Sequence, residues 1–187
     1  ARYGVTLVRP VCGNGILEHG EPCDDGRPQA GVTCERCHKV LRQPLESEVG
    51  VANDDYTNSM ALRPAGGLST PFTVAGSLSV CDIDMFDFDA AAGRRVVLTL
   101  RPATPGASCP AGVTLALQRT DRPEGDALTT VPATVPEAVV ETRDGCPAVV
   151  LAQAARDGVY FARVSAPQTG LERDFAYQLS VQVGDPE

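Results

Sequence analysis

The chain has 187 residues, a formal net charge of −8 and a hydrophobic share of 43%, which is ordinary for a globular protein. Nucleic-acid binding depends on clustered Lys and Arg, so this charge excludes a nucleic-acid partner from our expectations. No apolar run is long enough to span a bilayer, and no charged-then-apolar leader opens the chain, so we expect any signal peptide to have been removed. Seven cysteines beside two histidines and two methionines favour an oxidising compartment, outside the cell or on its surface.

The N-terminal part of the chain divides by composition. Residues 3–9 alternate in polarity and predict a short strand that Pro10 ends. Four cysteines follow between positions 12 and 37, in a polar stretch that cannot offset its ordering entropy by burial and therefore needs covalent or metal staples. The expected organisation is an N-terminal strand (1–10), a disulfide-rich module (11–40), a linker (41–52) and a β-sandwich (53–187).

The sandwich is predicted from short strands separated by Gly and Pro turns. The last of them, residues 175–183, alternates strictly with period two. Residues 119–137 predict a long exposed loop, and Asp87 and Asp89 predict a solvated strand face. A helix over 148–156 is the weaker alternative, because Val149 and Val150 favour a sheet. The fold class is thus all-β, with an antiparallel sandwich, and its strands are expected at 71–80, 84–90, 96–100, 113–118, 138–142, 148–153, 159–164 and 175–183.

Two carboxylates at the start of one strand suggest a cation site. Asp82 and Asp84 are two residues apart, so a strand points both to the same side, where they repel unless donors or a cation neutralise them. Asn53 and Asp54 offer further oxygen ligands for calcium. The alternative interpretation is a solvated acidic strand end.

The cysteine-rich module offers a second set of oxygen ligands. Its polar residues are typical calcium ligands, but they are also strong turn formers that need no metal. These residues are Asn14, Glu18, Glu21, Asp24 and Asp25.

The sequence CERCH at 34–38 also matches the c-type haem attachment motif. In that alternative Cys34 and Cys37 bind haem c covalently, His38 is the axial ligand and His19 is the second histidine. Such use of Cys34 and Cys37 competes with their use in disulfides.

Three further cysteines each precede a predicted strand of the sandwich. If strands alternate in direction, these positions gather at one end, so we expect one disulfide, with Cys109 and Cys146 as candidates. Which of them and Cys81 is left over stays open. Both histidines lie in the module and no G-x-S-x-G motif occurs, so no catalytic residues are predicted.

Residues 12–37 resemble the myxococcal cysteine-rich repeat through Cys12-Gly-Asn-Gly, Gly20-Glu-Pro-Cys23-Asp-Asp-Gly and the closing Cys34-x-x-Cys37. The resemblance implies disulfides among these four cysteines, for which three pairings exist. Arg27 and Val32-Thr33 depart from the family pattern.

Residues 53–183 resemble the bacterial pre-peptidase C-terminal domain. The matching motifs are Asn53-Asp54, DIDMFDF at 82–88, AAGRRVVLTL, DGVYFARVS at 157–165 and the closing FAYQLSVQV. The resemblance implies a jelly-roll-like β-sandwich and calcium shared by Asn53, Asp54, Asp82 and Asp84. Val51 stands where the family has a further Glu ligand.

These observations lead to one functional expectation and two alternatives. We expect a non-enzymatic secreted or cell-surface interaction and adhesion module, with calcium as a candidate cofactor and a protein or surface polymer as partner. The first alternative is a subunit of an extracellular filament or surface layer, in which residues 3–9 add as a strand to a neighbouring copy. The second is electron transfer through haem c at CERCH.

Overall fold

A computed structural model describes most of the predicted sandwich and a short piece of the chain before it. The described residues are 33–35, 38–41, 53, 54, 56, 58–120, 132–167, 171 and 174–186, and within 33–41 only the side chain of Val40 is described. The predicted strand at 3–9 lies outside them. Within the described residues no helix is long and apolar enough to cross a membrane.

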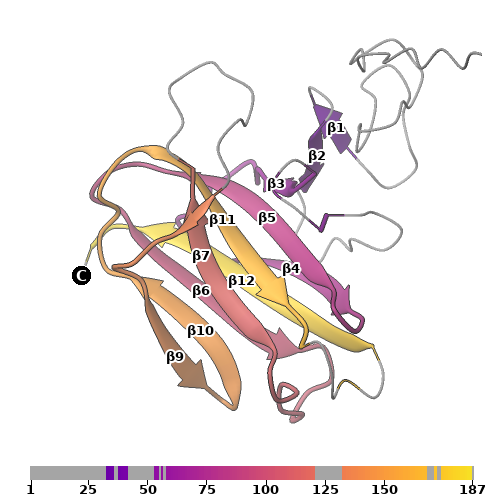
Figure 1. Cartoon of the computed structure of the whole chain (residues 1–187). Helices are drawn as coiled ribbons and strands as arrows, with labels where there is room; N and C mark the ends of the chain where they lie inside the picture. The colour runs from indigo at the N-terminus through magenta and orange to yellow at the C-terminus, as the bar shows by residue number, and fades with distance from the viewer. Residues whose placement is uncertain are drawn as a thin grey trace, which may run out of the picture.

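The fold is all-β, with two sheets packed face to face (Figure 1). One sheet has seven strands, in the order β1 (Thr33–Glu35), β2 (His38–Leu41), β3 (Met60–Leu62), β5 (Ile83–Ala90), β11 (Gly158–Ser165), β7 (Thr114–Arg119) and β8 (Ala133–Thr134). The other has five strands, in the order β4 (Phe72–Leu78), β12 (Phe175–Gly184), β6 (Arg95–Pro102), β10 (Cys146–Leu151) and β9 (Val139–Arg143).

From β4 to β7 each successive strand crosses to the opposite sheet, and the chain crosses again at β9, β11 and β12. Most pairings are antiparallel, which confirms the predicted antiparallel sandwich. The pairings of β2 with β3 and of β3 with β5 are parallel, which the sequence analysis did not expect. Strands β1 and β2, from the stretch assigned to the cysteine-rich module, thereby extend the seven-stranded sheet.

The core follows from period-two alternation along the central strands. On β12 every second side chain is fully or nearly fully buried, and on β6 the same holds for Val96, Leu98 and Leu100. These faces meet Phe86 and Phe88 of β5 and Tyr160 of β11 from the opposite sheet. Because β6 and β12 bury one face and leave the other partly exposed, the apolar pattern fixes the register of the five-stranded sheet.

The strands predicted from residue 71 onward are confirmed, with bounds that shift by a few residues. The helical alternative over 148–156 is wrong, because β10 continues to Leu151 and pairs with β6. Two short strands were not predicted from the sequence. Strand β3 lies before the first predicted strand of the sandwich, and β8 lies in the expected long loop.

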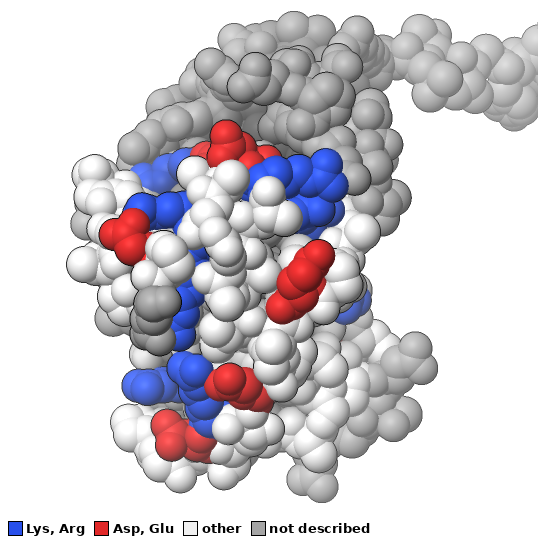
Figure 2. Space-filling model, turned by 90° about the vertical axis from the view of Figure 1, so that its left-hand side faces the viewer, with Lys and Arg blue, Asp and Glu red and all other residues white. Residues whose placement is uncertain are grey.

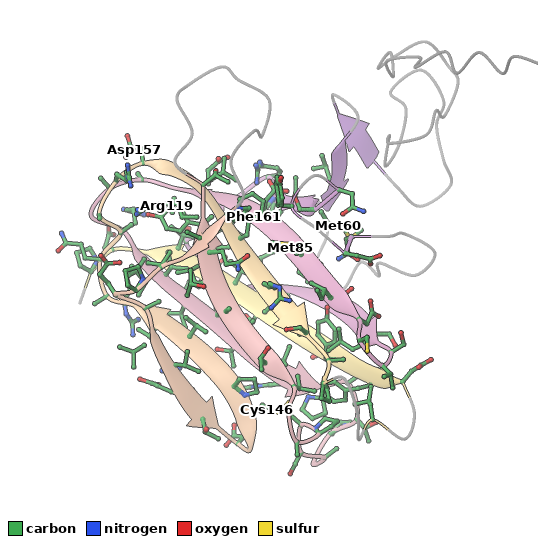
Figure 3. The ribbon with its side chains drawn as sticks, in the orientation of Figure 1. Met60, Met85, Arg119, Cys146, Asp157 and Phe161 are labelled. Atoms are coloured by element: carbon green, nitrogen blue, oxygen red, sulfur yellow. A yellow bond between two sulfur atoms is a disulfide. The ribbon has the colours of Figure 1, made fainter. Side chains whose placement is uncertain are left out.

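The expectation of a solvated face at Asp87 and Asp89 is wrong for Asp87. Asp89 is exposed, but Asp87 is buried, and its carboxylate accepts hydrogen bonds from Ser59 Oγ at 2.8 Å and Arg63 Nη2 at 3.0 Å. The same outer side of the sheet also buries Phe161, which lies opposite Asp87 on β11 (Figure 3). Arg63 thus fastens the segment after β3 to β5.

We predict that Arg63→Ala destabilises the fold by about 1–2 kcal/mol, because the buried Asp87 carboxylate then keeps fewer donors. The measurement is urea-induced unfolding followed by circular dichroism. Asp89→Ala is the control, since this exposed carboxylate also lies near Arg63, with 3.4 Å between Asp89 Oδ2 and Arg63 Nη2. Because the pair is exposed to solvent, the loss of Asp89 should cost less than about 0.5 kcal/mol. Equal effects of the two substitutions would contradict the role given to Asp87.

Candidate functional site

The residues expected to hold calcium in the sandwich lie around the start of β5. Asp84 faces the core side of β5 with Phe86 and is 3% exposed. The backbone carbonyl of Asn53 accepts a hydrogen bond from Met85 N–H at 2.8 Å. Because Met85 directly follows Asp84, this bond holds the buried Asn53 close to the start of β5. Asp54 is exposed.

Protein groups donate hydrogen bonds to the carboxylates of both Asp82 and Asp84. Asp82 accepts backbone N–H bonds from Ser79 at 3.0 Å and from Ile83 at 2.9 Å, which close the turn between β4 and β5. Asp84 Oδ2 accepts a hydrogen bond from the Tyr177 hydroxyl at 2.7 Å. A cation is therefore not required to relieve repulsion here, and calcium at Asn53, Asp54, Asp82 and Asp84 stays a prediction.

The acidic and cysteine residues of the module lie almost entirely outside the described residues. This holds for the oxygen ligands from Asn14 to Asp25, for Cys12, Cys23 and Cys37, and for His19. Only the backbone of Cys34 and His38 is described, in β1 and β2. Among the residues that the structure covers, no group of three or more His, Cys, Asp and Glu side chains is placed to hold a metal ion. The module calcium site, its disulfides and the haem alternative stay predictions.

A disulfide joins Cys109, in the loop before β7, to Cys146 at the start of β10. One disulfide was expected within the sandwich, and this is that bond. The exposed Cys81 is not part of it. Cys146 lies at the lower end of the sandwich in Figure 3, at the end opposite Arg119 and Asp157. The bond ties the 103–110 loop to the hairpin of β9 and β10.

The hairpin turn has the chemistry that a two-residue connection requires. Arg143 pairs with Cys146, so Asp144 and Gly145 alone form the turn, with φ of 52° and 76°. Asp-Gly is a favoured pair for this left-handed turn, whose twist matches that of the strands. A side chain at Gly145 would also meet Ser108 Oγ at 3.3 Å, because the 103–110 loop packs against the turn.

Strand β9 is the outer edge of the five-stranded sheet, and all five of its residues are exposed (Figure 1). Val140 shares a sheet face with its neighbour Val149, which is 1% exposed, yet Val140 itself is 64% exposed. Val139, on the other face, is 58% exposed. The described part of the opposite sheet therefore does not cover β9, and two large apolar side chains flank an edge that no described strand pairs with.

The backbone of β9 presents hydrogen-bonding groups along this edge. Residues that flank a two-residue hairpin turn form a hydrogen-bonded pair, and bonded and unbonded positions then alternate along the strands. Arg143, Glu141 and Val139 therefore bond β10, while Val140 and Thr142 direct their N–H and C=O groups away from it. No described residue of the chain pairs with that side of β9. The geometry is that of a sheet edge which can accept a further strand.

The surface seen from the side of Figure 1 on which β9 lies carries both signs of charge. In Figure 2 blue and red residues are interspersed among white ones. On β9 itself, Arg143 donates to Glu141 Oε2 through Nε at 3.1 Å and Nη2 at 2.9 Å. This pairing leaves the strand with no net charge, so its edge is suited to a protein segment rather than to a polyanion.

Sequence reasoning located β9 but not its role. Val139 and Val140 in the sequence AVVET favour a β-strand, but they do not distinguish a buried strand from one at the edge of a sheet. The signal that could have shown an edge is the position of this strand, immediately after a Pro- and Glu-containing turn and immediately before a two-residue hairpin. That position leaves one side of the strand to the hairpin partner and the other side to solvent.

No family model matches the sequence, so the two family resemblances of the sequence analysis stay predictions. Solved structures with some likeness are PliG of Aeromonas hydrophila and PliG of Salmonella Typhimurium, both periplasmic lysozyme inhibitors of g-type lysozyme. The first is 13% identical, with a TM-score of 0.43 over 67% of this chain and 95% of its own. The second is 13% identical, with a TM-score of 0.42 over 66% and 95%. Likeness at this level does not transfer a function or a partner to the present chain.

We predict that Tyr177→Phe destabilises the protein by about 1–3 kcal/mol, because the buried Asp84 carboxylate loses a hydroxyl donor. Tyr160→Phe is the matched control. Tyr160 is equally buried, but its hydroxyl donates to the backbone carbonyl of Arg156 at 3.0 Å, so its loss should cost less. Chemical unfolding of both variants gives the comparison, and a larger effect for Tyr160→Phe would speak against a special role for the Asp84 bond.

Proposed function

We propose that this chain is a non-enzymatic interaction module of an extracytoplasmic protein and that it binds protein partners by adding a strand to the open edge of β9. The observation that carries the proposal is the exposure of Val139 and Val140 on a strand whose outer backbone groups pair with no described residue. Strand addition gives affinity through main-chain hydrogen bonds and selectivity through alternating side chains. Adhesion to a protein partner is the finer form of this proposal.

The extracytoplasmic location is supported by the disulfide between Cys109 and Cys146. Disulfides persist in oxidising compartments and are rare in the cytosol. The bond also supports the binding role, because it anchors the turn end of the hairpin that carries β9. A binding edge needs a rigid support, since ordering a mobile strand on binding would cost conformational entropy.

We expect amide hydrogen exchange to alternate along β9 in the dilute protein. The N–H groups of Glu141 and Arg143 donate to β10 and should be protected, whereas those of Val140 and Thr142 should exchange at rates close to those of an unfolded chain. Exchange followed by NMR reads each amide, so neighbouring residues of one strand control for each other. Protection of Val140 and Thr142 at micromolar concentration would mean that the edge is already covered, and the proposed function would then fail.

A second candidate is the filament or surface-layer subunit, in which residues 3–9 of one copy add to a sheet edge of the next. The open edge of β9 favours it, because strand donation needs such an acceptor. A head-to-tail contact of this kind builds fibres when its rotation does not close. The synthetic peptide YGVTLVR is the probe, and its binding should protect the Val140 and Thr142 amides.

We also propose calcium as a stabiliser of the sandwich, on the residue set around Asn53 and Asp84. Calcium bound to the folded chain alone should raise the unfolding temperature, by an amount that corresponds to about 2.7 kcal/mol at a hundredfold excess over Kd. Calorimetry in calcium and in EGTA measures the shift. Asp54→Asn should remove it, whereas Asp24→Asn removes it if the ion sits in the cysteine-rich module. Identical unfolding temperatures in calcium and EGTA would end the calcium proposal.

A further inference from the structure

The edge of β9 is complementary to itself. When two copies of the strand run antiparallel with Val140 opposite Val140, the apolar residues meet at the centre. At each end, Arg143 of one copy then lies beside the turn that carries Glu137 of the other, and both residues are exposed. We propose that two copies of this chain associate through β9 in this register, about a twofold axis at Val140. The inference rests on the proposed role of β9 as a binding edge and names its partner as a second copy.

The backbone groups of this stretch fit the register. Val140 directs its N–H and C=O outward, so the two copies exchange a reciprocal pair of hydrogen bonds at the axis. Thr142 N–H lies opposite the Ala138 carbonyl of the second copy. The Ala138 N–H already donates to the Val135 carbonyl at 3.2 Å, which leaves the Ala138 carbonyl as the group available at this position. The five-stranded sheets of the two copies thus join into one continuous sheet.

The side-chain charges select this register over its neighbours. Val139, Glu141 and Arg143 share one face of β9 because strand residues alternate, and Arg143 is already held along that face by Glu141. The exposed Glu137 lies in the turn that precedes β9. A shift that pairs Val140 with Thr142 would place Glu141 opposite Glu141, and directly opposed like charges destabilise a sheet. In the proposed register, Glu141 lies opposite Val139, and each Arg143 gains a second carboxylate at Glu137.

A second copy suits the edge better than an unrelated extended segment. The charges and apolar residues of 137–143 are arranged so that residue i meets residue j and j meets i, which is the requirement of an isologous contact. The contact is short, far below the roughly 1,600 Å² of a standard stable interface. The association is therefore expected to be a concentration-dependent monomer–dimer equilibrium.

The test uses the full chain in sedimentation velocity and equilibrium over a concentration series. Arg143→Glu and Glu137→Arg each place like charges opposite one another and should weaken dimerisation by about tenfold or more. The double variant Glu137→Arg/Arg143→Glu restores opposite charges and should recover the dimer to within about threefold of the natural chain. Val140→Lys places two ammonium groups at the axis and should abolish the dimer, whereas Val80→Lys, at another exposed valine, should leave it unchanged.

Two controls separate folding from association. Val140→Pro removes an N–H that does not serve the hairpin, so it should block the dimer while thermal unfolding and the Cys109–Cys146 disulfide are retained. The series is repeated in Cys81→Ser, because the exposed Cys81 could otherwise cross-link two copies.

The inference is overturned if the chain stays monomeric up to about 1 mM, where even weak contacts are populated. It is also overturned if the charge exchange does not restore association, if the dimer is lost in Cys81→Ser, or if open-ended fibres form that vanish on deletion of residues 1–9. In each case exchange at Val140 and Thr142 reports separately on the proposed function. If the Val140 and Thr142 amides exchange fast and an added strand peptide protects them, the proposed binding edge is supported and only the self-pairing is rejected.

Discussion

The hydrogen bond from Tyr177 to Asp84 joins the two sheets between the start of β12 and the start of β5. Tyr177 belongs to β12 in the five-stranded sheet and Asp84 to β5 in the seven-stranded sheet, and both are almost completely buried. A buried carboxylate is tolerated only where donors surround it, so its position relative to β12 is closely constrained. That constraint fixes where β5 begins and, through Asn53, where the chain reaches the sandwich. Tyr177 is itself a member of the buried apolar core.

The sequence predicted most of the sandwich because period-two alternation is a strong signal where one face is buried. Residues 175–183 show it without exception, and the structure has β12 there. The failures occur where tertiary contacts override local pattern. Met60–Leu62 is too short to show a period and becomes a strand because β2 and β5 flank it in parallel. Asp87 was expected in solvent because its neighbours alternate, but Ser59 and Arg63, from a distant segment, bury it.

The candidate site was less predictable than the fold for a physical reason. Acidic residues are the usual candidates for metal binding and catalysis in a sequence. In this sandwich, however, the carboxylates of Asp82, Asp84 and Asp87 accept hydrogen bonds from other parts of the fold. The surface that supports a function is built from ordinary strand residues, Val139 to Arg143. Their role depends on the lack of a described neighbouring strand on the outer side of β9. Local sequence does not show which strands become neighbours in a sheet, because the partners come from distant parts of the chain. The Cys109–Cys146 bond could be anticipated only as one of several pairings.

The disulfide has a mechanical consequence for any partner held on β9. A force that pulls the partner along the strand passes through the Asp144-Gly145 turn to Cys146, at the start of β10. From there the covalent bond carries part of the load to Cys109 and the loop before β7, in the opposite sheet. The hydrogen bonds between β10 and β6 are thus loaded in parallel with a covalent link and need not bear the force alone. Under tension, the contact at β9 should part before the hairpin peels away, so a tethered module would release its partner and remain folded.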